Sequence, residues 1–126
     1  MESTDRDILK RYNEGQRAFV DLDLEDGDLS GLDLEGISFD RCFLAIDFSY
    51  SNLSRAKFTN GNIKKSIFRN AKLTEAHFEK VAIESTDFSN ATIDKIVFKE
   101  NYAYGSVVNK EGFLRLLEET ERISEG

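Results

Sequence analysis

The sequence predicts an all-β solenoid, a chain wound into stacked coils, on the strength of three observations. From residue 22 to residue 100 a large apolar residue returns at almost every fifth position, a small residue stands two positions before most of them, and phenylalanines return about every twenty residues. A period of five fits neither an α-helix, which repeats every ~3.6 residues, nor a strand, which repeats every ~2. The apolar side chains therefore share one interior only if the backbone turns a corner once per repeat.

The repeat also predicts the number of corners in each coil. The sixteen central positions are all large and apolar: Leu24, Leu29, Leu34, Phe39, Leu44, Phe48, Leu53, Phe58, Ile63, Phe68, Leu73, Phe78, Ile83, Phe88, Ile93 and Phe98. Ten of the positions two residues earlier are small: Gly27, Cys42, Ser51, Ala56, Gly61, Ser66, Ala71, Ala76, Thr86 and Ala91. Four groups per coil would place like above like, in two mainly aromatic and two aliphatic columns. We therefore expect about four square coils, in which stacked phenylalanine rings add to the apolar burial.

One irregularity interrupts the repeat, because Phe39 and Phe48 are nine residues apart instead of ten. Two registers are compatible with this spacing. If Leu44 is the central residue, its column stays aliphatic and Cys42 takes the small position. If Phe43 is central, Arg41 points inward. We favour Leu44.

The pattern approximates A(D/N)LXX and resembles the pentapeptide-repeat family over residues 22–100, with sixteen successive matches. The resemblance implies a right-handed quadrilateral β-helix with a turn at each corner and short bridges between coils. The segment ILKRYNEGQRAF before the repeats is similar to that of short cyanobacterial members of the family.

Both ends of the repeat region carry a predicted capping helix, because an uncovered terminal coil exposes backbone edges that pair with other chains. The chain then divides into a helical N-terminal cap at 1–21, the solenoid at 22–100 and a C-terminal segment at 101–126. Thr4 followed by Asp7 is typical of a helix start. Asn109 is suited to begin a second helix, expected over about 110–123.

The sequence contains no pattern typical of catalysis or of cofactor binding. His77 is the only histidine and occupies an outward position, so no second histidine completes a metal site. Cys42 is expected to be a packed core thiol. The acids Asp23, Asp28 and Asp33 stand on successive corners and point in different directions, so they do not converge on one calcium ion. We expect no enzyme, no cofactor and no metal.

Composition and charge limit the class of partner. The chain has 126 residues, 40% hydrophobic and 33% charged, with no apolar run long enough for a bilayer. An acidic N-terminus without an apolar segment and a single cysteine are typical of a cytoplasmic protein. The net charge of −7 argues against binding to nucleic acid or to an anionic membrane. Residues 22–41 carry a net −6, whereas residues 61–80 carry a net +3.

The leading functional hypothesis is a rigid protein-interaction module with an unknown protein partner. Its candidate contact residues are four apolar residues in outward positions: Phe43, Tyr50, Ile67 and Val97. Single apolar residues on a surface are also normal for any soluble protein. Ile67 and Val97 fall on different faces, so the four form no single patch.

Two alternatives concern the charge. Some pentapeptide-repeat proteins resemble duplex DNA and bind a topoisomerase such as DNA gyrase, conferring quinolone resistance. Four coils are short for such a mimic, the C-terminal helix lacks an obvious dimerising seam, and the third coil is basic. Self-association of the acidic first coil with the basic third coil is the other alternative, so we expect a monomer or a weak homo-oligomer.

Overall fold

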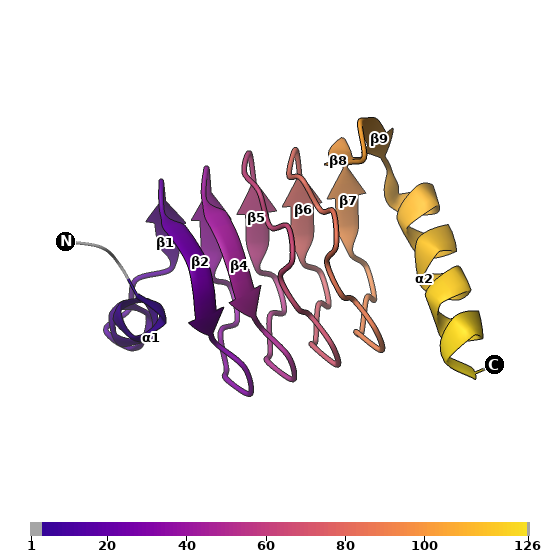
Figure 1. Ribbon diagram of the computed structural model, residues 1–126. Helices are drawn as coiled ribbons and strands as arrows, with labels where there is room; N and C mark the ends of the chain where they lie inside the picture. The colour runs from indigo at the N-terminus through magenta and orange to yellow at the C-terminus, as the bar shows by residue number, and fades with distance from the viewer. Residues whose placement is uncertain (1–3, 126) are drawn as a thin grey trace.

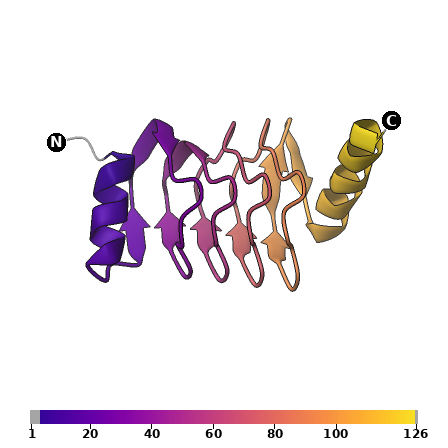
Figure 2. The same ribbon diagram turned by 90° about the horizontal axis from the view of Figure 1, so that it is seen from below.

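The computed structural model describes residues 4–125, with side chains as far as Glu118, and Figure 1 shows a stack of coils between two helices. The elements in chain order are α1 (Asp5–Asn13), β1 (Ala18–Val20), β2 (Asp23–Asp28), β3 (Ser38–Asp40), β4 (Phe43–Asp47), β5 (Lys57–Thr59), β6 (His77–Glu79), β7 (Val97–Lys99), β8 (Asn101–Ala103), β9 (Ser106–Val108) and α2 (Lys110–Glu125). Helices α1 and α2 lie at opposite ends of the stack (Figures 1 and 2). The predicted solenoid with a helix at each end is confirmed.

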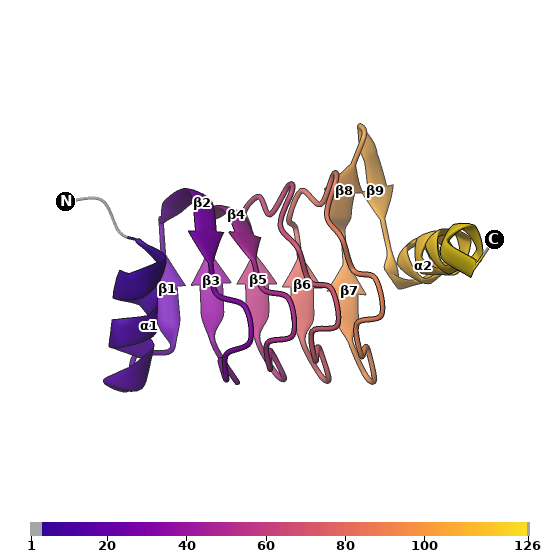
Figure 3. The same ribbon diagram turned by 60° about the horizontal axis from the view of Figure 1, so that its bottom comes forward.

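One face of the solenoid is a five-stranded parallel sheet in the order β1-β3-β5-β6-β7 (Figure 3). The residues in register along this sheet are Phe19, Phe39, Phe58, Phe78 and Phe98. The chain thus completes four turns between the first and the last of them. Strand β1 precedes residue 22, so the first coil starts within the segment expected to form the N-terminal cap. The other faces consist of the pair β2-β4 and of single parallel bridges such as Asn62↔Ala82.

The predicted columns fill the interior. Fifteen of the sixteen central residues are buried, and Ile93 is half-buried. Within the two aromatic columns the rings stack: Phe58 and Phe78 lie 4.9 Å apart at 7°, and Phe68 and Phe88 lie 4.9 Å apart at 5°. Between the columns the rings meet edge to face, as Phe58 and Phe68 do at 5.5 Å and 89°. Both arrangements are favourable for aromatic quadrupoles.

The corners turn on a residue in the left-handed region, two positions after most central residues. Tyr50 (φ 62), Glu75 (φ 60) and Asn90 (φ 58) are examples, and most of these residues are not glycine. An L-residue in this conformation costs about 1–2 kcal/mol. The corner is held because its N–H donates to the next coil, as from Glu75 to the carbonyl of Asp94 at 2.9 Å.

The Asp or Asn before many central residues has a local structural role. Its carboxyl or amide oxygen accepts from the backbone N–H two residues on, in an Asx turn. Asp47 accepts from Ser49 and Asn62 from Lys64, each at 2.9 Å. These side chains therefore prepare the corner that follows.

The irregular group has the register we favoured. Leu44 is 3% exposed and pairs with Leu24, whereas Phe43 is 57% exposed. The resemblance implied a turn at each corner, and this is wrong here. Neither Leu24 nor Leu44 has a left-handed residue two positions later, and strands β2 and β4 continue through the bend. Glu25 and Asp26 of β2 form a bulge opposite the single residue Ala45, since the register shifts between Leu24 and Gly27. The missing residue is thus absorbed by replacing a turn with extended chain.

The two helices cover the ends of the stack in different ways. Thr4 and Asp7 form the predicted capping box of α1. The Asp5 carboxylate accepts from the N–H of Asp28 at 2.9 Å, so α1 satisfies backbone of the first coil. Asn109 accepts from the N–H of Gly112 at 3.0 Å and begins α2.

Replacing Phe68 by Ala should destabilise the fold by about 3–5 kcal/mol, because the ring is fully buried between Phe48 and Phe88 and its loss leaves a cavity. Urea unfolding measures the free energy. Phe43→Ala is the control and should change it by less than about 0.5 kcal/mol, since the side chain is exposed. Equal losses in the two variants would contradict the inward columns.

Replacing Glu75 by Gly should raise the free energy of unfolding by about 0.5–1 kcal/mol, because relief of the left-handed strain exceeds the added chain entropy. Thermal or urea unfolding measures the change. Lys57→Gly, within strand β5, is the matched control and should lower the free energy by a similar amount. A loss of stability in both variants would sink the account of the corners.

Candidate functional site

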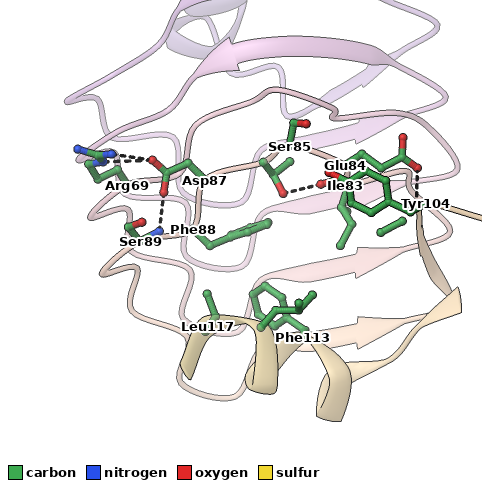
Figure 4. Close-up of a pocket in the computed structure, with 13 residues that line it drawn as sticks. Arg69, Ile83, Glu84, Ser85, Asp87, Phe88, Ser89, Tyr104, Phe113 and Leu117 are labelled. Carbon is green, nitrogen blue, oxygen red and sulfur yellow. Dashed lines mark hydrogen bonds and ion pairs between the residues drawn. The ribbon is translucent and has the colours of Figure 1, made fainter. Parts of the chain in front are cut away.

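A groove with a cavity volume of about 540 Å³ opens between the last coil and α2 (Figure 4). We call it the C-terminal groove. Its residues are the coil segment 83–89 with Arg69, Ala103 at the end of strand β8 with Tyr104 after it, and Phe113, Leu116 and Leu117 of α2. The groove therefore joins the end of the repeat to the segment where the repeat stops.

Helix α2 is anchored beside the groove by Phe113, which is 2% exposed. Its ring stacks on Phe98 at 4.2 Å and meets Phe88 edge to face at 5.0 Å. Phe113 thus covers the last rings of both aromatic columns. Leu117, one turn further along α2, is half-buried and continues the apolar wall opposite Phe88 (Figure 4).

Polar contacts fix one side of the groove. Asp87 accepts from the Arg69 guanidinium at 2.9 Å and from the Ser89 N–H at 2.9 Å. Partial burial acts to raise the pKa of Asp87, but the hydrogen bonds from Ser89 and Arg69 outweigh it and lower the pKa overall. Asp87 is therefore held as a charged acceptor.

The far side of the groove is held by Glu84. Its carboxylate accepts from the Lys64 ammonium at 3.1 Å and from the Tyr104 N–H at 3.0 Å. These contacts lower the pKa of Glu84, and the hydrogen bond from Lys64 has the largest effect. Tyr104 itself is 79% exposed and stands at the mouth (Figure 4). An exposed aromatic residue beside an apolar wall is typical of a binding surface.

A second cleft, of about 360 Å³, lies at the register irregularity. Glu25, Phe43, Ala45, Lys64 and Lys65 are among its lining residues. It exists because Ala45 stands alone where the first coil has two residues. Its walls are mostly exposed side chains, so it holds fewer fixed groups than the C-terminal groove.

The structure does not bring the four predicted contact residues together. Phe43 and Tyr50 are 57% and 68% exposed, whereas Ile67 and Val97 are half-buried. Phe43 shares a row with Asn62, and the rows of Ile67 and Val97 belong to two other faces. Phe43 lines the second cleft, and none of the four lines the C-terminal groove.

Sequence reasoning missed Tyr104 and the coil edge as parts of a site. The C-terminal helix was predicted from the sequence, but only as a cap. The break in the repeat after residue 100 was the available signal, because it marks where no further coil covers the last one.

Part of the charge of the basic third coil is paired within the chain. Lys64 and Arg69 contact Glu84 and Asp87, which lie about one coil further on in sequence. Such exposed pairs each contribute about 0–1 kcal/mol. These pairs nevertheless place acids of the same chain beside the bases of the third coil. The self-association hypothesis needs those bases to contact the acidic first coil of another molecule.

The other residues considered for chemistry have structural partners. His77 Nε2 lies 2.9 Å from a carboxylate oxygen of Glu79 on the surface of β6. Cys42 is buried, and burial raises the pKa of its thiol. Within the part of the chain that the structure describes, no three His, Cys, Asp or Glu residues gather as a metal site. No helix among the same residues is long and apolar enough to cross a bilayer.

Comparison with known sequences agrees with the geometry. The family model described as Pentapeptide repeats matches residues 47–92 in 8 copies. No curated protein matches the chain. Residues 47–92 are thus pentapeptide repeats, as the resemblance implied, and such repeats form a β-helix like the stacked coils of this chain.

Replacing Glu84 by Gln should lower the free energy of unfolding at pH 7 and have little effect at pH 3. The lowered pKa of folded Glu84 means that its contacts stabilise the fold above the unfolded pKa, and that this contribution is lost as pH falls through the folded pKa. Urea unfolding at both pH values measures the difference. Glu75→Gln, at an exposed corner, is the control, and a pH-independent loss in Glu84→Gln would count against the assigned contacts.

Proposed function

We propose that this protein is a non-enzymatic repeat scaffold that binds a partner protein in the C-terminal groove. The main support for this proposal is the groove itself, which combines a concave shape, an apolar wall and fixed polar groups at one end of a rigid stack. Binding sites in proteins usually have this combination.

The rigidity of the stack favours such a role. Phe88 at the groove is supported by the stacked ring of Phe68, and Phe113 is packed against two rings. A wall that does not move on binding avoids the entropy of ordering it. The exposed Tyr104 and the half-buried Leu117 then offer apolar surface at low cost.

The groove is favoured over the flat faces and over mimicry of duplex DNA. Phe43, Ile67 and Val97 are distributed over three faces, so they give a partner no common contact area. A mimic bound by a topoisomerase such as DNA gyrase needs negative charge along the axis near phosphate intervals. Here Lys64, Arg69 and their acids alternate between neighbouring coils.

The groove predicts which substitutions abolish partner capture. The double variant Tyr104→Ser, Leu117→Lys should retain at least tenfold less partner protein from source-cell lysate than the unchanged full chain does. Quantitative mass spectrometry measures the retained amount. The matched control, Ile67→Lys with Val97→Lys, should retain it. Circular dichroism melts of both variants establish that the fold is intact.

The two arms also separate the alternatives. Loss of the partner only in the Ile67, Val97 variant would reject binding in the groove and favour binding on the faces of the solenoid. A gyrase supercoiling assay with micromolar protein tests the mimic, and inhibition that survives in the groove variant would replace the proposed function. Light scattering at low and high salt reports whether the protein itself associates.

A further inference from the structure

The inner coils show how the backbone on the groove side of the stack is normally paired. The N–H of Phe68 donates to the carbonyl of Asp87 at 2.6 Å, and the N–H of Asn70 donates to Ser89 at 2.9 Å. In return the N–H of Asp87 donates to the carbonyl of Ser66 at 3.1 Å. Each coil thus offers two donors and one acceptor to the coil that follows.

The same three groups of the last coil lie along the groove edge and have no following coil. They are the carbonyl of Thr86 and the N–H groups of Phe88 and Asn90, and the structure shows no backbone partner for them within residues 4–125. After Phe98 the chain continues over a different face, because Tyr102 pairs with Ala82 and strand β8 then turns into the hairpin with β9. This coil edge is therefore an open template for an extended chain.

The first coil shows by contrast how a capping helix pairs backbone groups of a terminal coil. There the side chains of α1 reach the backbone, with Asp5 accepting from the Asp28 N–H at 2.9 Å and the Tyr12 hydroxyl donating to the Glu35 carbonyl at 2.7 Å. Helix α2 meets the last coil instead through the Phe113 ring, which pairs no backbone group. The three groups at Thr86–Asn90 therefore lack the side-chain partners that α1 gives to Asp28 and Glu35.

The opposite wall of the groove specifies the side chains of an occupant. Alternate residues of an extended chain point to the same side. On the edge Thr86–Asn90, the inward residue is Phe88, which is next to Phe113 and across from Leu117 (Figure 4). An added strand would therefore place one apolar side chain toward α2 and its neighbours toward solvent.

We propose that the C-terminal groove binds an extended segment of a partner polypeptide, which adds as a further parallel strand to the edge Thr86–Asn90. The inference rests on the proposed function, and it names the class of ligand. The paired segment covers about 13 Å at ~3.3 Å per residue, so the contact needs only about four residues with an apolar one near the centre. A helical ligand satisfies its own backbone and leaves the Thr86, Phe88 and Asn90 groups unpaired.

The test uses a blocked peptide with the sequence of residues 84–90, Glu-Ser-Thr-Asp-Phe-Ser-Asn, because this strand has the register that the stack repeats. Added to the full ¹⁵N-labelled chain at up to millimolar concentration, it should shift the amide signals of Phe88 and Asn90 and slow their hydrogen exchange. N-methylation at the peptide's Asp should weaken binding about tenfold, because that N–H is the donor to the Thr86 carbonyl. N-methylation at its Phe is the matched control and should have little effect, since that N–H points away from the edge.

Each other outcome overturns the inference. No binding, equal weakening by the two N-methyl groups, or shifts that avoid Phe88 and Asn90 would reject strand addition. A dimer in light scattering that the peptide dissociates would assign the edge to a second copy of this chain. If the Tyr104, Leu117 variant loses the captured partner while the two methylated peptides behave alike, the proposed function stands and strand addition fails. If that variant keeps the partner, the proposed function fails.

Discussion

Every regular coil of this solenoid closes because a residue two positions after each central apolar residue is held at positive φ. The bend returns the chain to the stack axis, so the next central side chain also faces inward. Residues such as Tyr50 and Glu75 lack the conformational freedom of glycine, and their strain is offset by hydrogen bonds to the neighbouring coil. A single coil has no such neighbour. The corner, the ring columns and the backbone pairing are therefore stable only together, as expected for a repeat whose units contact only adjacent units.

The same dependence makes the two ends of the stack the places where backbone pairing must be completed by something else. Helix α1 completes part of it with polar side chains, through Asp5 and Tyr12. Helix α2 completes the apolar part with Phe113 and leaves the polar edge beside a groove. The two ends of the stack thus differ in the backbone groups that they offer to a partner polypeptide.

The faces are chemically uniform by comparison. Their charges form cross-coil pairs about twenty residues apart, among them Arg41 with Asp21, Arg55 with Glu35 and Lys64 with Glu84. These pairs are exposed, so each adds little stability. These pairs place opposite charges on neighbouring coils, which works against the extended single-sign field that steering or mimicry would need.

The sequence by itself determined the repeat, the inward residues and the columns. A large apolar residue at every fifth position can be buried in one common interior only if the chain turns once per repeat. The sequence also favoured the register at Leu44, since that choice keeps an arginine out of the core, and the structure then decided between the two registers. It did not determine how the missing residue is absorbed, because the bulge in β2 and the extended bend in β4 depend on two coils in contact. Nor did it locate the groove: the edge at Thr86–Asn90, the exposed Tyr104 and the α2 wall come from segments that meet only when the chain leaves the stack after Phe98. Which backbone groups stay unpaired is a property of neighbours in space, and the tertiary structure alone decided it.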